Sequence, residues 1–378
     1  MTRILSVSSS RADVGILMPV WRSLVSRSDV ELHLFLTGMH QAAGAPTVAG
    51  LPDQALVHRG GADLGGTSGS AAAEAMASIA AAAGDVIAAI RPLVILVVGD
   101  RLDMLPSATA SLPFSLPLVH LHGGEITEGA IDNRIRHAIS KLAHWHCVAT
   151  VGARERLIGM GELAETIEVT GAPGLDTLRA TPVLSRAEFL NRVALPVAPA
   201  FRLITVHSET NATDPLAPVN ATLEALAARP APTLFTAPNS DPGGAEVRRR
   251  IESFCRAHES SFFVDTLGSI LYPNALRHAS VMLGNSSSGV IEAGMFGLPV
   301  INVGDRQKGR ERGANVIDVS NDPAAVLGAL DRVTADGVRV ARGTPYGDGA
   351  AAPRVAAILR EVTSTRGVST NSAQAANA

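Results

Sequence analysis

The feature that most constrains the fold is a repeated alternation of short, β-branched apolar runs with longer amphipathic segments. Apolar runs without polar alternation are typical of strands covered on both faces, as in parallel sheets joined by helices. A first series of predicted strands comprises residues 3–7, 31–36, 93–98, 116–120, 146–149 and 168–169. A second series comprises residues 202–206, 233–236, 261–264, 281–283 and 300–303. Predicted helices include residues 15–25, 70–89, 135–143 and 215–228.

Two strand series in a chain of 378 residues predict two domains. Each series is long enough for its own doubly wound sheet, so we expect an α/β protein with two Rossmann-like domains and a cleft between them. We place the first domain at residues 1–175 and the second at 176–362, with a C-terminal helix that packs back on the first. Residues 45–70 are predicted to be a mobile loop, and the polar residues 363–378 a disordered tail.

Composition excludes several classes of protein. The formal charge is -3 and aromatic residues make up 3%, which argues against nucleic acid as a partner. Cys147 and Cys255 stand far apart, so neither a disulfide framework nor a zinc site is expected. The N-terminus lacks the features of a signal peptide, and no uninterrupted apolar stretch reaches membrane-spanning length. We expect a cytoplasmic protein that is not bound to a membrane.

Charged side chains follow the predicted strands of the first half, where open α/β sheets bind ligands. Asp100 and Arg101 follow residues 93–98, Glu125 follows residues 116–120, and Asp132 lies just beyond; Arg11 follows the first strand. Clustered carboxylates raise the pKa of at least one member, which provides an acid/base pair for proton transfer. The alternative to a functional role is that these are solvated loop residues, with Arg11 and Arg101 in ion pairs.

The second half carries a phosphate-type pattern. After an apolar run, the residues Gly284-Asn285-Ser286-Ser287-Ser288 lead into a predicted helix that contains Glu292. Free N–H groups at such a turn suit a phosphate, and Glu292 suits a ribose hydroxyl. An ordinary capped helix is the competing interpretation. Further polar candidates at strand ends are His207, Asn239 and Arg306, and His137 is either a ligand-facing or a core histidine.

Five motifs together resemble the UDP-N-acetylglucosamine 2-epimerase family, nearest its hydrolysing branch. They are Gly99-Asp100-Arg101, His122-Gly123-Gly124-Glu125, Asp132-x-x-x-Arg136-His137, Gly171-Ala172-Pro173-Gly174-Leu175-Asp176 and Asn285-Ser286-Ser287-Ser288-Gly289-x-x-Glu292. Each motif is short, but the combination is specific and spans the chain to about residue 362. The resemblance implies a GT-B fold, a UDP-sugar substrate bound mainly by the C-terminal domain, a homodimer, and neither a cofactor nor a metal.

The resemblance also implies a reaction. UDP is eliminated across C1–C2 to give a 2-acetamidoglucal, which the hydrolysing branch converts with water into N-acetylmannosamine and the other branch into UDP-N-acetylmannosamine. By motif, Asp100, Glu125 and Asp132 match carboxylates that move protons, while His207 and Arg11 match groups at the diphosphate. Ser286, Ser287 and Ser288 match the phosphate-binding turn, and Glu292 the ribose-binding glutamate.

Two departures keep the product open. Asn133 stands where the hydrolysing branch has a second carboxylate, and Ser208-Glu209-Thr210-Asn211 stands where it has Pro-Val-Thr. We expect hydrolysis to N-acetylmannosamine and UDP. The alternatives are a non-hydrolysing epimerase, action on a UDP-2,4-diacetamido-6-deoxy hexose, a GT-B glycosyltransferase, and a catalytically silent nucleotide-sugar sensor.

Overall fold

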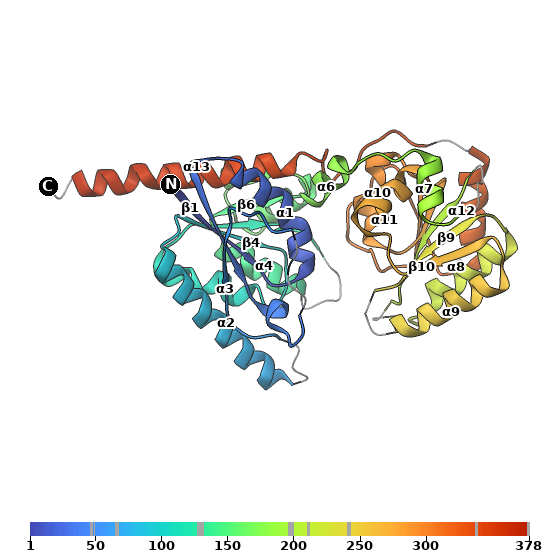
Figure 1. The fold of residues 1–378 in the computed structure, drawn as a ribbon, viewed down its shortest axis with the longest axis horizontal. Coiled ribbons are helices and arrows are strands. Elements are labelled where there is room, and N and C mark those ends of the chain that lie inside the picture. Colours follow the sequence, from blue (N-terminus) through green and yellow to red (C-terminus); the bar gives the residue numbers. More distant parts are fainter. Residues whose placement is uncertain are drawn as a thin grey trace. The chain divides into compact units, whose positions relative to one another are not determined.

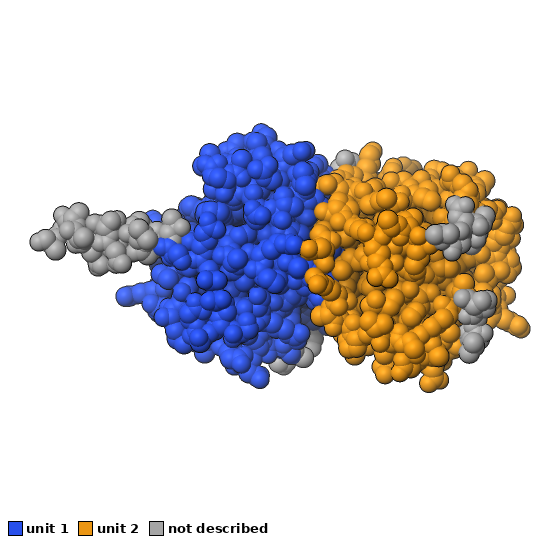
Figure 2. Space-filling model, turned by 90° about the horizontal axis from the view of Figure 1, so that it is seen from above, with its two compact units in different colours: residues 1–177, 349–378 blue, residues 178–348 orange. Residues whose placement is uncertain are grey.

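The computed structural model describes residues 1–45, 48, 50–64, 68–126, 132–195, 200–209, 212–239, 243–336 and 339–375, and of residues 334–336 and 365–375 the backbone alone. The chain divides into two units, which Figure 2 distinguishes by colour. The first joins residues 1–177 to residues 349–378, and the second comprises residues 178–348.

The first unit is built on a parallel, 7-stranded sheet with the order β3-β2-β1-β4-β5-β6-β7. Its strands are β1 Thr2–Ser8, β2 Val30–Leu36, β3 Leu56–Arg59, β4 Val94–Val98, β5 Leu118–Leu121, β6 Trp145–Val148 and β7 Ile167–Val169. The central strand β4 is buried along its whole length, as its continuous apolar sequence predicts. The strand order reverses at β1, so ligand-binding loops are expected at the carboxyl ends of β1 and β4.

Helices cover this sheet on both faces (Figure 1). They are α1 Arg11–Val25, α2 Gly69–Ile90, α3 Leu105–Ala110, α4 Asp132–Leu142, α5 Val151–Gly159, α6 Gly174–Ala180 at the boundary of the units, and α13 Ala351–Ala375, with short 3₁₀ turns at Gly38–Gln41, Leu112–Phe114 and Ala164–Thr166. α1 packs beside α13 and α3 packs beside α2 and α4. Right-handed crossovers that run in opposite directions from β1 along the sheet place their helices on opposite faces. For this reason α1 and α13 form one layer, and α2, α3 and α4 form the other.

The second unit repeats this plan with the 6-stranded order β10-β9-β8-β11-β12-β13. Its strands are β8 Arg202–Thr205, β9 Thr233–Thr236, β10 Ser261–Val264, β11 Val281–Gly284, β12 Val300–Val303 and β13 Val316–Val319. Its helices are α7 Arg186–Arg192, α8 Ala217–Ala228, α9 Gly244–Ala257, α10 Gly268–His278, α11 Ser287–Ile291 and α12 Pro323–Asp336, with a 3₁₀ turn at Ala293–Phe296. Both sheets have Rossmann-type order, so the expected GT-B fold with two doubly wound domains is confirmed.

The C-terminal helix α13 belongs to the first unit, far from it in sequence. Val355 and Leu359 of α13 are fully buried in the core that α1 and the sheet share. The two carboxylate oxygens of Asp176 each accept a backbone N–H, from Ala351 and Ala352, at 2.9 Å. Asp176 therefore caps the start of α13 in the manner of an N-cap, although it lies 175 residues away from Ala351.

The structure differs from the sequence expectations at the sheet margins and at the C-terminus. The edge strand β3 lies inside residues 45–70, where only a loop is expected, and the edge strand β13 is in neither predicted series. The segment predicted as a disordered tail from residue 363 is instead helical as far as Ala375, and Thr363 is buried.

One described helix, α2, is long and apolar enough to cross a membrane by length and composition alone. Ile87 and Ile90 of this helix are buried in the core of the first unit. A core helix of an α/β domain meets the same two criteria, so this is weak support for a membrane span. Cys147 and Cys255 are both free thiols.

Candidate functional site

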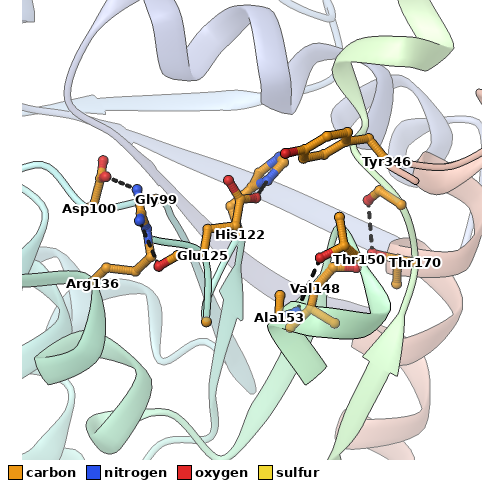
Figure 3. Close-up of polar contacts among 12 residues, drawn as sticks. Gly99, Asp100, His122, Glu125, Arg136, Val148, Thr150, Ala153, Thr170 and Tyr346 are labelled. Atoms are coloured by element: carbon orange, nitrogen blue, oxygen red, sulfur yellow. Dashed lines mark hydrogen bonds and ion pairs between the residues drawn. The ribbon is translucent and has the colours of Figure 1, made fainter. Parts of the chain in front are cut away.

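Asp100 and Glu125, predicted from separate motifs, are joined by one buried arginine at the carboxyl end of the first sheet (Figure 3). Asp100 follows β4, Glu125 follows β5, and Arg136 lies on α4. One guanidinium nitrogen of Arg136 forms an ion pair with the Asp100 carboxylate, and another donates to the main-chain oxygen of Glu125 at 2.8 Å. Arg136 is only 5% exposed, so these two contacts hold its guanidinium, and with it both residues, in place.

The turn after β5 brings His122 onto Glu125. The Nδ1 atom of His122 lies 2.7 Å from Oε1 of Glu125, and both side chains are partly open to solvent (Figure 3). His122 has a φ of 63°, in the left-handed region that is costly for a residue with a Cβ. A Cβ on Gly123 would come within 2.9 Å of the ring of His120, so the turn is held close against the sheet.

His120 connects this turn to the loop that carries Asp100. Its Nε2–H donates to the main-chain oxygen of Gly99 at 2.8 Å, and its Nδ1 accepts from the Ser140 hydroxyl at 3.1 Å. The side chain is fully buried, and burial lowers the pKa of His120 to about 3. A neutral imidazole on β5 therefore fixes the position of the loop after β4 relative to the turn that follows β5.

Arg101 and Asp132 lie in a second charged group at the same end of the sheet. Arg101 donates to both carboxylate oxygens of the buried Asp103, at 3.1 and 3.3 Å, so the ion-pair alternative for this residue is realised. Burial opposes the charge of Arg101, but Asp103, Asp13 and Asp132 raise the pKa of its guanidinium. Asp132 opens α4 one turn before Arg136, on the same helix face.

Arg11 and His137 are not drawn into these contacts. Arg11 is the exposed first residue of α1. His137 is half-buried on α4, and burial, then the charges of Arg136 and Arg156, lower the pKa of its ring. Their predicted roles in substrate binding stay predictions.

In the second unit, Asn285 joins the ends of two neighbouring strands. The main-chain N–H of His207, after β8, donates to Oδ1 of Asn285 at 2.7 Å, and the Asn285 amide donates back to the His207 oxygen at 3.0 Å. The N–H of Asn239, after β9, donates to Nδ1 of His207 at 3.1 Å. Because Nδ1 accepts, a neutral His207 carries its proton on Nε2, which suits it to donate to an anion.

The predicted phosphate turn begins a short helix. Ser286 is the N-cap of α11, and its hydroxyl accepts from the N–H of Ser288 at 3.4 Å. The Ser288 hydroxyl donates to Glu292 at 2.7 Å and accepts from the Tyr272 hydroxyl at 2.6 Å. Burial raises the pKa of Glu292, against the hydrogen bond from Ser288. Ser288 thus orients the glutamate that was predicted to bind the ribose.

Arg306 lies on a loop whose main chain is held by the buried carboxylate of Glu209. Oε1 of Glu209 accepts the main-chain N–H groups of Asp305 and Arg306, at 2.7 and 3.0 Å. Gly304 has a φ of 79°, and a Cβ there would collide with the Glu209 carboxylate. Arg306 and Gln307 both donate to the main-chain oxygen of Asn285, which ties the loop after β12 to the predicted phosphate turn.

The sequence alone predicts no function for His122, Arg136 or Glu209. The available signal for His122 and Arg136 is that they belong to two of the family motifs, whereas Glu209 is notable only as a departure from the family pattern. The departures Thr210 and Asn211 lie outside the described residues. Within the described ranges, no three His, Cys, Asp or Glu side chains group closely enough to hold a metal ion.

Comparisons with known proteins show that the chain is similar to epimerases. The family model described as UDP-N-acetylglucosamine 2-epimerase matches residues 22–360. A UDP-N,N'-diacetylbacillosamine 2-epimerase (hydrolyzing) of Legionella pneumophila is 35% identical over 364 residues, which cover 95% of this chain and 96% of that protein. A GDP/UDP-N,N'-diacetylbacillosamine 2-epimerase (hydrolyzing) of Campylobacter jejuni is 30% identical over 322 residues, 84% of each chain.

A solved structure shares the fold. The crystal structure of a UDP-GlcNAc 2-epimerase from Neisseria meningitidis bound to UDP-GlcNAc superposes with a TM-score of 0.76, and covers 95% of this chain and 100% of that one. Its sequence identity of 17% limits this likeness to the fold.

Proposed function

Because the chain belongs to the UDP-N-acetylglucosamine 2-epimerase family, we propose that it is a hydrolysing 2-epimerase of a UDP-2,4-diacetamido-6-deoxy hexose. The observation that carries this substrate is the 35% identity, over 95% of the chain, to an enzyme named for UDP-N,N'-diacetylbacillosamine. The Campylobacter relative, named for the same sugar, supports it. This sugar replaces N-acetylglucosamine, which the motifs alone favour.

The proposed reaction needs proton transfer at C2 while UDP leaves from C1. Asp100 and Glu125 are the carboxylates that we assign to this chemistry, because Arg136 holds both at the end of the first sheet. Asp132, one turn ahead of Arg136, is assigned to assisting the addition of water. Deleting one such acid or base costs about 10²–10⁴-fold in rate.

We assign the UDP moiety to the second unit. The His207 Nε2–H and the guanidinium of Arg306 supply positive character for the departing diphosphate, and Arg11 is proposed as a further diphosphate-binding residue. The N–H groups at Ser286, Ser287 and Ser288 suit a phosphate, and Glu292 suits the ribose. Asn239, Arg101 and His137 are proposed as further substrate contacts. We also propose that the enzyme works in the cytoplasm as a homodimer.

Hydrolysis of UDP-N-acetylglucosamine is the second candidate, supported by the description of the family model. Asn133, which stands in place of a second carboxylate, keeps a non-hydrolysing outcome testable. A GT-B transferase needs the same nucleotide site but has no use for two acidic residues, Asp100 and Glu125, that one arginine holds together.

Proton NMR in D2O tests these candidates. The enzyme is incubated with UDP-N,N'-diacetylbacillosamine or with UDP-N-acetylglucosamine, without acceptor sugar. We expect free 2-epimer, deuterated at C2, and UDP from the first substrate at a much higher kcat/KM than from the second. The reverse order would replace the proposed sugar by N-acetylglucosamine. A C2-deuterated UDP-linked epimer would overturn hydrolysis, and no deuteration of either substrate would overturn epimerase function.

A further inference from the structure

The hydrogen bond between His122 and Glu125 determines which ring nitrogen carries the proton. An ionised carboxylate has only acceptors, so the contact of 2.7 Å requires a proton on Nδ1 of His122. In a neutral ring the lone pair then lies on Nε2. Among the residues that the structure describes, the hydrogen bond at Nδ1 is the only one that the His122 ring makes. The His122 and Glu125 side chains are 15% and 16% exposed, so the pair is not fully enclosed.

The backbone is built to present this ring. His122 directly follows β5 and adopts a φ of 63°, in the left-handed region that is unfavourable for a residue with a Cβ. Strained residues of this kind cluster at functional sites, where the surroundings over-determine them. Here Gly124, with a φ of 74°, packs so close to α5 that a Cβ would collide with the main-chain oxygen of Ala153. Gly123 and Gly124 therefore fix the turn, and His122 is the member of the turn that carries a reactive side chain.

We propose that His122 is a catalytic residue whose Nε2 takes the proton from C2 of the sugar, with Glu125 as its orienting partner. This assignment rests on the proposed epimerase function and changes the role of Glu125 within it. In the step, the C2–H bond breaks and its proton goes to Nε2. The electron pair of that bond forms the C1–C2 double bond, and the C1–O bond breaks with its pair on the β-phosphate oxygen of UDP.

The competing assignment makes Glu125 itself the base. A carboxylate that accepts an N–H from an imidazole is stabilised in its charged form and is a weaker base for that reason. The Asp100 carboxylate is already engaged in an ion pair with the buried Arg136. The Nδ1–H bond to Glu125 leaves the lone pair of the neutral His122 ring on Nε2, and this is the form in which histidine acts as a general base. The dyad therefore places a base at Nε2.

The variant His122→Asn separates these assignments. Asparagine tolerates the left-handed backbone and can keep an N–H toward Glu125, but it lacks Nε2 as a base. We expect the rate of C2 deuteration to fall by about 10²–10⁴-fold, with unchanged UDP affinity by calorimetry and an unchanged melting temperature. His144→Asn, at an exposed histidine of the same unit, is the matched control and should retain activity.

A second variant guards against misfolding. His122→Gly suits the positive φ and leaves space for a free imidazole, so added imidazole should restore C2 deuteration in a saturable manner. Wild-type activity in His122→Asn would overturn the dyad while leaving the epimerase assignment intact. Loss in His122→Asn without imidazole rescue of a folded, UDP-binding His122→Gly would also overturn it. Absence of deuteration by the wild-type enzyme would overturn the proposed function itself.

Discussion

At the scale of single residues, the chain uses buried cations and imidazoles to place its carboxylates. Arg136 contacts one carboxylate and the main chain beside another, and His120 fixes the two loops that carry them. Each of these partners lies on a different element from the group it positions. Their removal should therefore affect chemistry and stability in separable ways.

Asp100→Asn should lower turnover by about 10²–10⁴-fold while leaving UDP affinity nearly unchanged. The amide keeps the shape and an acceptor for Arg136 but removes the charge needed in proton transfer. Steady-state kinetics measures the first effect and titration calorimetry with UDP the second. An equal loss of UDP binding would contradict the assignment of Asp100 to proton transfer.

Acid should destabilise the protein partly through His120. The unfolded ring titrates near 6.5 and the buried ring near 3, so between these pH values only the unfolded state takes up the proton. Stability is therefore present above pH 6.5 and is lost as the pH falls. On going from pH 7 to pH 5, the free energy of unfolding of His120→Gln should fall by about 2 kcal/mol less than that of the wild type, as measured by urea denaturation. Identical pH dependence of the two proteins would show that His120 is not held neutral.

The sequence allowed the acidic members of the site to be named but not their partners. Asp100 and Glu125 follow apolar strands, a local pattern that can be read directly. The contact of Arg136 with Asp100 spans 36 residues, and that of Glu209 with Asp305 spans 96. Such contacts form only once the sheet has brought the ends of its strands together. No local sequence pattern predicts them.

At the scale of elements, the loop after β12 depends on one buried carboxylate. Glu209→Ala removes the acceptor for two main-chain N–H groups and should free the loop that carries Arg306. We expect UDP affinity to fall at least tenfold by calorimetry, which corresponds to the loss of about 1.4 kcal/mol. Glu224→Ala, at an exposed position on α8, is the matched control. Unchanged UDP affinity in Glu209→Ala would remove this loop from the nucleotide site.

Helix α13 should depend on Asp176 for its first turn. Asp176→Ala leaves the N–H groups of Ala351 and Ala352 without their side-chain acceptor, at a cost of about 1–2 kcal/mol. Thermal unfolding should show a lower melting temperature, and limited proteolysis faster cleavage near residue 350. Asp331→Ala, which removes an exposed ion pair with Arg229, should change neither. Equal effects of both changes would argue against a specific cap.

Strand prediction found the central strands and the edge strands β7 and β10, but missed the edge strands β3 and β13. Strands such as β4 and β11 are buried from end to end, and their sequences contain no polar side chain. In the edge strand β3, Leu56 and Val57 are 50% and 43% exposed, and polar residues flank them. β13 is likewise only partly buried. An edge strand needs less apolar sequence, so its pattern resembles a loop.

At the scale of the whole molecule, the first unit is assembled from both ends of the chain. A chain that stops after Asp348 lacks α13 and exposes the surface that Val355 and Leu359 cover. We expect it to aggregate or to bind the dye ANS, whereas a chain that stops after Ser364 should keep the wild-type melting temperature. A soluble, cooperatively melting product from the shorter chain would show that α13 is dispensable for the core.

This arrangement also constrains how the protein folds during its synthesis on the ribosome. Residues 1–177 emerge first, yet their hydrophobic core is completed only by residues that follow position 349. The second unit is contiguous, so it can fold while the first still waits for its last helix. The unit whose synthesis begins first is therefore the last to complete its fold. Until α13 is made, the apolar surface that it will cover is exposed and is a target for chaperones.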